Sequence, residues 1–126
     1  MIFVDTNVFM YAVGRDHPLR EPARAFLEHS LDHNQRLVTS AEVIQELLHA
    51  YLPVGRISTL DSALTLARSV AEIWPVEMAD VVHARILHNR YPGLGARDLL
   101  HLASCQRRRV SQVKTFDQAL ASAFRP

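Results

Sequence analysis

The chain has 126 residues, of which 48% are apolar and 21% are charged, as in ordinary globular proteins. This length suits one domain, so we expect a single domain over residues 1–126 with one continuous core. The composition excludes a disordered chain, and no apolar stretch reaches the roughly 18 residues of a transmembrane helix. The start, Met1 to Val4, runs directly into Asp5 and is too short for a signal peptide, which favours the cytoplasm.

Charge and cysteine content narrow the cellular setting further. The 14 basic and 13 acidic residues give a formal net charge of +1, which by itself predicts no nucleic-acid partner. Lys114 is the only lysine, so nearly all the cations are arginines, whose forked guanidinium groups suit phosphates. Cys105 is the only cysteine, which excludes an internal disulfide and agrees with a reducing compartment.

The first half of the chain alternates strand and helix patterns. A short apolar strand should end at Asp5, and Thr6 and Asn7 should form a turn. Ser40 looks like the N-cap of a helix that Pro53 and Gly55 terminate, and Ser58 to Asp61 resembles a capping box. The expected segments are a strand at 2–4, helices at 8–13 and 22–32, a strand at 36–39, and helices after residues 40 and 58.

The second half continues the alternation. It is expected to contain an extended piece at 73–76, helices at 78–89 and 96–108, a strand at 110–115 and a last helix at 117–124. Strands separated by helices predict an α/β fold with a parallel sheet between helical layers. In such a sheet, ligands bind beyond the carboxyl ends of the strands.

Several acids fall where that edge should be. Asp5 follows the first strand, Thr39 and Ser40 end the second, and Thr115 to Asp117 follow the last. Glu46 and Asp98 lie in the helices after residues 40 and 95. Each acid also has a purely structural explanation. Asp5 could form a turn, and Glu46 could be an ordinary solvated residue of a helix. Asp98 could place favourable charge at a helix N-terminus, and Asp117 could be an N-cap. No single acid is therefore decisive.

Four segments together resemble the motifs of the PIN-domain family, and within it the VapC-type toxins of toxin–antitoxin pairs. The segments are Ile2 to Val8, Thr39 to Leu48, Ala96 to Ala103 and Val113 to Asp117. They occur in the family's order and cover nearly the whole chain. The resemblance implies a three-layer sandwich whose mainly parallel central sheet has four or five short strands flanked by helices.

The resemblance also implies a metal-dependent endoribonuclease that hydrolyses RNA phosphodiester bonds. Its acidic cluster of Asp5, Glu46, Asp98 and Asp117 would hold one or two Mg²⁺ or Mn²⁺ ions, the hard cations that oxygen ligands suit. The residues expected to support this cluster are Thr6, Asn7, Ser40 and Thr115. The residues expected to contact RNA are Arg15, Arg97 and Lys114. The expected partners are RNA, a small antitoxin protein and a second copy of the chain in a homodimer, with no membrane contact.

Two details of this site stay open. Glu42 lies about one helical turn before Glu46 and competes with it for the second acidic position, although the motif position favours Glu46. Gln118 and Ala119 follow Asp117 where some relatives carry another acid, so the occupancy of a second metal site is undecided.

Three other functions compete with the nuclease hypothesis. The first is a PIN fold that binds RNA or protein without cutting. The second is a di-iron helix bundle, suggested by acids three residues before His49, His83 and His101, although prolines break the helices and these histidines are expected at helix surfaces or core edges. The third is a phosphatase with Asp5 as nucleophile. The cluster Arg107 to Arg109 is interpreted as favourable charge at a helix C-terminus.

Overall fold

The computed structural model describes all 126 residues and has a four-stranded parallel sheet at its centre. The strands, in the spatial order β3-β2-β1-β4, are β3 (Ala71–Trp74), β2 (Leu37–Ser40), β1 (Ile2–Val4) and β4 (Gln112–Lys114). All neighbouring strands are parallel. The prediction of an α/β fold with a mainly parallel sheet of four or five short strands is confirmed.

Strand β1 lies inside the sheet, between β2 and β4. Phe3 and Val4 are completely buried, as expected for a strand of a parallel sheet that helices cover on both faces. The register pairs Ile2 with Leu37 on one side and with Gln112 on the other. The Thr39 hydroxyl donates a hydrogen bond to the Val4 carbonyl oxygen (2.8 Å), which fixes the ends of β1 and β2 together.

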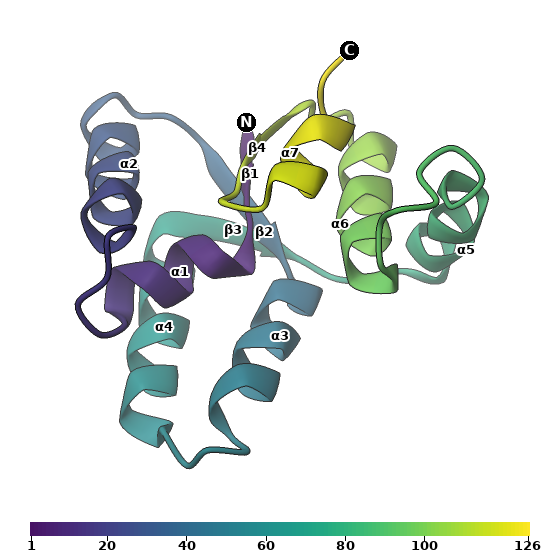
Figure 1. Ribbon diagram of the computed structural model, residues 1–126. Coiled ribbons are helices and arrows are strands. Elements are labelled where there is room, and N and C mark those ends of the chain that lie inside the picture. Colours follow the sequence, from purple (N-terminus) through teal and green to yellow (C-terminus); the bar gives the residue numbers. More distant parts are fainter.

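The chain has seven helices, which lie in two groups around the sheet (Figure 1). Helices α1 to α4 gather on one side, and α5 to α7 gather on the other. Their bounds are α1 (Thr6–Val13), α2 (Arg20–Asp32), α3 (Ala41–Tyr51), α4 (Ile57–Val70), α5 (Met78–Leu87), α6 (Ala96–Arg107) and α7 (Gln118–Ala123). None of these helices combines the length and the apolar character needed to cross a bilayer.

The apolar side chains form two cores. The larger one joins the sheet to helices α1 to α4 and to α6, with Phe3, Phe9 and Leu47 among its fully buried members. A smaller one joins α5, α6 and α7 through side chains such as Leu87, Leu102 and Ala123. Helix α6 packs against the sheet through Cys105 and His101, and against α5 and α7 through the smaller core.

Several expected boundaries were wrong, among them the extended piece expected at 73–76, which is the strand β3 at Ala71–Trp74. Three others have a clear local reason. Helix α1 begins at Thr6 and includes Asn7, because the Asp5 carboxylate accepts a hydrogen bond from the Thr6 amide and caps the helix. Helix α2 begins at Arg20, before Pro22, which lies in the first turn where proline is tolerated. Helix α4 begins at Ile57 with no side-chain cap, so the expected capping box at Ser58 does not form.

A capping box forms instead at the start of α5. Asp80, which is completely buried, accepts hydrogen bonds from the Glu77 amide (2.9 Å) and from the guanidinium groups of Arg107 and Arg108 at the end of α6 (2.5 and 3.0 Å). Burial alone raises the pKa of Asp80, but the Glu77 amide and the two arginines outweigh it and hold this pKa below its usual value. Arg107 and Arg108 thus attach α5 to α6, which explains this part of the arginine cluster better than charge at a helix end.

The same network removes the di-iron alternative. Asp80 forms ion pairs with two arginines, and His83 is half-buried and hydrogen-bonded to Gln106 (2.9 Å). The Asp80–His83 pair therefore lies apart from the other two acid–histidine pairs, and the chain is not a helix bundle.

Candidate functional site

The strand order locates one special point at the carboxyl edge of the sheet. From β1 the chain moves outward through β2 to β3, whereas β4 lies on the opposite side of β1. This reversal between β1 and β4 is a topological switch point, where open parallel sheets form ligand crevices. Asp5 directly follows β1, and Thr115 and Asp117 directly follow β4, so both ends meet at the crevice.

Asp5 is buried, with only 5% of its surface exposed. Its Oδ1 accepts a hydrogen bond from the Thr6 amide (2.7 Å), and its Oδ2 accepts one from the Thr115 hydroxyl (2.7 Å). Burial raises the pKa of Asp5 above its ordinary value, although His101 and these two hydrogen bonds counteract part of the effect. The side chain is therefore held in one orientation at an electrostatic cost.

Thr115 joins the two strand ends. While its hydroxyl donates to Asp5, it accepts hydrogen bonds from the Asn7 side-chain amide (3.3 Å) and from the Asp117 backbone amide (3.0 Å). The Asn7 side-chain oxygen in turn accepts from the Phe116 amide (3.2 Å). Asn7 and Thr115 thus link the end of β4 to Asp5 through hydrogen bonds. Thr6 contributes only its backbone amide, because its hydroxyl is buried without a partner.

Glu46 reaches this point from the middle of α3, and it meets a residue that the sequence analysis did not assign to the site. His101 on α6 is completely buried, and its Nε2 forms a hydrogen bond to Glu46 Oε1 (2.5 Å) and lies 3.8 Å from Asp5 Oδ1. Burial lowers the pKa of His101, but Glu46, Asp5 and Asp98 outweigh it, so the net shift is upward. A protonated His101 offsets part of the charge of the acids around it.

The prediction that His101 lies at a helix surface or core edge was therefore wrong. Its spacing of three residues after Asp98 on one helix was the available signal, because residues so spaced share a helix face. That signal could not reveal Glu46 as its partner, since 55 residues separate the two.

Asp98 and Asp117 complete the acidic group. Asp98 lies in the first turn of α6, and its pKa is raised to about 6, first by burial and then by the negative charges of Asp5, Asp117 and Glu46, with His101 counteracting. Asp117 caps α7, and its Oδ1 accepts hydrogen bonds from the amides of Ala119 and Leu120 (2.9 and 3.3 Å). The cap uses only one of its two carboxylate oxygens.

All four predicted acids line one cavity of about 250 Å³. Its other lining residues include Asn7, His49 and Arg97. Glu42, the competitor of Glu46, is not among them. Ser40 is buried and does not line the cavity either, because its hydroxyl accepts from the Val43 amide (3.4 Å) and caps α3. Lys114 also lies outside the lining, with its ammonium group over the rings of Phe26 and Phe116 (5.6 and 4.9 Å).

The donor set of this cavity fits a hard divalent cation in kind, since it consists of carboxylates that repel one another. In their present rotamers, however, no three acid, histidine or cysteine side chains lie close enough together to hold a metal ion. The Glu46 carboxylate is directed to His101 instead. Metal binding would therefore require at least one of these side chains to rotate toward the others.

The raised pKa of Asp98 predicts how stability depends on pH without metal. The folded chain keeps the Asp98 proton up to about pH 6, whereas the unfolded chain releases it near 3.8. The free energy of unfolding should therefore fall as pH rises through this window, by about 1–2 kcal/mol from this partly exposed group.

Urea unfolding in EDTA at a series of pH values tests this prediction on wild type and on Asp98→Asn. The variant should be the more stable form above pH 6, and its advantage should shrink toward pH 4. A stability advantage of Asp98→Asn that is constant across this pH range would contradict a raised pKa of Asp98.

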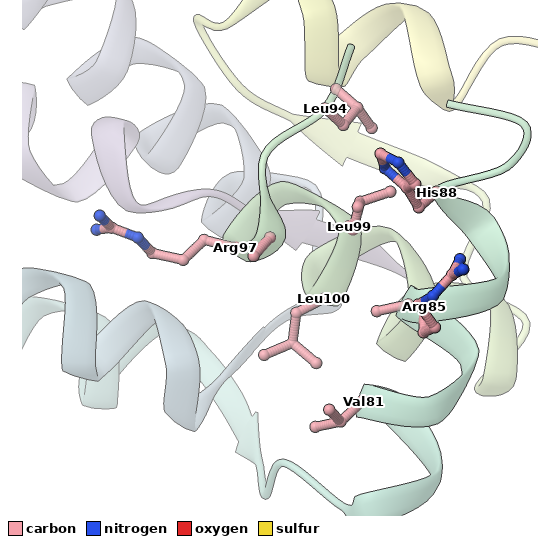
Figure 2. A pocket seen from close by; sticks show the side chains of 9 residues that line it. Val81, Arg85, His88, Leu94, Arg97, Leu99 and Leu100 are labelled. Atoms are coloured by element: carbon pink, nitrogen blue, oxygen red, sulfur yellow. The ribbon is translucent and has the colours of Figure 1, made fainter. Parts of the chain in front are cut away.

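A larger pocket of about 500 Å³ lies between α5 and α6 (Figure 2). It is mostly apolar, with Val81, Leu94, Leu99 and Leu100 in its lining, and it contains no carboxylate. Arg97 borders both this pocket and the acidic cavity, and in Figure 2 its side chain extends away from the apolar lining. The pocket therefore adjoins the acidic site without contributing donors to it.

Comparison with known proteins agrees with this arrangement. The family model described as "PIN domain" matches residues 2–124. The chain is 79% identical over 125 residues to Ribonuclease VapC23 of Mycobacterium tuberculosis, and this alignment covers 99% of each of the two chains. The crystal structure of Mycobacterium tuberculosis VapC20, a sarcin-ricin loop cleaving toxin, superimposes with a TM-score of 0.81 at 17% identity over 98% of this chain and 95% of that one.

A second solved structure, VapBC2 from Rickettsia felis bound to a DNA fragment from its promoter, gives a TM-score of 0.66 at 20% identity, covering 93% of this chain and 100% of that chain. At these identities the two structures establish the fold alone. The family model and the sequence identity to VapC23 go further, and they show that the chain belongs to the PIN-domain family and, within it, to the VapC proteins.

Proposed function

We propose that the chain is a divalent-metal-dependent endoribonuclease and the toxin of a toxin–antitoxin pair. The observation that carries the proposal is the convergence of Asp5, Glu46, Asp98 and Asp117 on one cavity at the switch point of the sheet. The 79% identity to a protein named as a ribonuclease supports the reaction. A cytoplasmic location is part of this proposal, because the substrate is RNA.

The four carboxylates would hold one or two Mg²⁺ or Mn²⁺ ions. When bound, the divalent charge offsets the negative charge that builds up on the attacked phosphodiester. The chain's own contribution is orientation, because the Thr6 amide and the Thr115 hydroxyl fix the Asp5 carboxylate. Groups that orient metal ligands in this way strongly affect both metal affinity and activity.

Arginine side chains near the cavity are proposed to bind the RNA phosphates. Arg97 is exposed and lines the cavity itself, so it is the best placed for the scissile phosphate. Arg15 lines a neighbouring hollow, whereas Lys114 stands over two aromatic rings and is the more remote of the three. The proposed protein partners are a small antitoxin and a second copy of the chain, and the VapBC2 neighbour supports the former.

A metal-dependence assay on purified protein tests the reaction. We expect internal cleavage of single-stranded RNA in Mg²⁺ or Mn²⁺, loss of cleavage in excess EDTA, and recovery when either ion is restored. Cleavage that persists in EDTA would contradict the role of the acids. RNA binding without cleavage under every condition would favour the competing hypothesis of a non-cutting PIN module.

A further inference from the structure

A second hollow continues from the acidic cavity along the exposed side of α1. It has a volume of about 410 Å³ and shares Asn7 and Met10 with the acidic cavity, so the two are adjoining parts of one surface. Its wall comes from three parts of the chain: α1, the segment after α1, and the turn between α3 and α4.

The charge of this hollow is opposite to that of the acidic cavity. Arg15, Arg56 and His17 line it, and Asp16 is its only acid. Arg15 and Arg56 have no carboxylate partner, unlike Arg36, Arg107 and Arg108, which form ion pairs elsewhere in the molecule. Two guanidinium groups without carboxylate partners are suited to bind an anionic molecule that reaches from the acidic cavity into this hollow.

The surrounding chain holds the Arg56 side chain and fixes the backbone turn that precedes Arg15. The Arg56 guanidinium stands over the Tyr51 ring (5.6 Å) and donates a hydrogen bond to the Thr59 hydroxyl (3.3 Å). Arg15 follows Gly14, where a Cβ atom would lie 2.7 Å from the Met10 carbonyl oxygen, so only glycine permits this close turn at the end of α1. The Arg56 guanidinium, which is held by these contacts, therefore loses less freedom when it binds an anion.

The hollow also offers aromatic surface. The rings of Tyr11 and His17 stack at 4.6 Å between centroids, and both residues line the hollow. Aromatic rings beside cationic groups are the combination that binds single-stranded nucleic acid, since the rings stack on bases and the cations contact phosphates.

We infer that this hollow is a binding subsite for the RNA strand next to the scissile phosphate, with Arg15 and Arg56 on its phosphates and the Tyr11–His17 stack against a base. The inference rests on the proposed ribonuclease function. It answers a physical need of that function, because a cluster of carboxylates repels a polyanion unless cations nearby attract it.

Binding of a fluorescein-labelled single-stranded RNA to the full chain in EDTA, measured by anisotropy at several salt concentrations, tests the subsite without requiring cleavage. We expect Arg15→Ala and Arg56→Ala each to weaken binding about three- to tenfold. The double variant should lower the slope of log K against log salt by about 1.4, or roughly 0.7 for each lost phosphate contact. Arg68→Ala, an exposed and unpaired arginine on α4, is the matched control and should bind like wild type.

The kinetic counterpart in Mg²⁺ should be a raised KM with an unchanged kcat, since the subsite touches no reacting atom. Equal binding and equal salt slopes for Arg15→Ala, Arg56→Ala and Arg68→Ala would overturn the inference while leaving the ribonuclease proposal standing. If wild type never cleaves RNA but the two variants still lose affinity for it, the ribonuclease proposal fails and the RNA subsite stands. Equal competition by a poly-glutamate peptide of the same charge would show a general anion surface and would overturn the assignment to RNA.

Because Arg56 contacts Tyr51, the thermal midpoint of each variant is measured alongside. Arg15 is exposed and makes no such contact, so Arg15→Ala keeps the test decisive if Arg56→Ala unfolds.

Discussion

Replacing Asp5 by asparagine should lower the rate of RNA cleavage at least about 100-fold while the chain stays folded. The carboxylate is the most deeply buried of the four acids in the cavity, and it is fixed by the Thr6 amide and the Thr115 hydroxyl. Asparagine has nearly the same shape but lacks the negative charge that a divalent ion needs. The loss should therefore fall on metal affinity and turnover and not on the fold.

Stability should respond differently from activity. Burial raises the pKa of Asp5, which means that the folded chain disfavours its charge. Asparagine removes this cost and keeps the oxygen that accepts from the Thr6 amide, although its amide group must face the Thr115 hydroxyl. These effects oppose each other, so the free energy of unfolding in EDTA should stay within about 1 kcal/mol of wild type.

Cleavage kinetics and urea unfolding on the same preparations check both halves of this prediction. Asp61→Asn is the matched control, because Asp61 is an exposed acid on α4 that lies outside the acidic cavity. It should cleave RNA at the wild-type rate. Equal cleavage by wild type and Asp5→Asn would mean that the activity belongs to a contaminating nuclease or that Asp5 is not a metal ligand.

Replacing Asp80 by alanine should destabilise the fold by about 3–5 kcal/mol, the largest loss of stability that we expect from a single change. Asp80 is completely buried, caps α5, and binds the guanidinium groups of both Arg107 and Arg108. Without it two arginines at the α5–α6 contact lose their shared partner, and a helix loses its cap.

Equilibrium urea unfolding at pH 7 measures this loss. The control is Glu72→Ala, because Glu72 forms an exposed ion pair with Arg36, in which both side chains are more than half exposed (57% and 62%), and such pairs contribute under about 1 kcal/mol. A loss of similar size in both variants would contradict the role of the buried network.

The pH dependence of the Asp80 contribution adds a second check. Since its pKa lies below the usual value, the stabilisation is present above about pH 4 and is lost as pH falls below that point. The difference between wild type and Asp80→Ala should therefore shrink in acid.

Much of the fold follows from local sequence patterns. An apolar run that ends in Asp5, helical periodicity between prolines and glycines, and the four motif segments were enough to predict strands, helices, a parallel sheet and the acids at its edge. These features depend on residues close together in the chain, where spacing fixes which face a side chain occupies. Errors arose where a side chain decides a boundary, as when the Asp5 carboxylate starts α1 at Thr6 and not at Val8.

The partners of the site residues could not be predicted in the same way. His101 meets Glu46 across 55 residues, and Thr115 meets Asp5 across 110. These pairs exist because β4 lies beside β1 and because α6 packs between the sheet and α5. No spacing rule reaches over such separations.

The sequence by itself therefore determined the set of acids, their order and the family to which the motifs belong. Only the tertiary structure decided that Glu46 and not Glu42 enters the cavity, that His101 lies buried among the acids, and that Asp80 engages two arginines while Arg15 and Arg56 stay unpaired. The physical reason is that local propensity fixes which face of a helix or strand a residue occupies, whereas packing and strand order fix what that face meets.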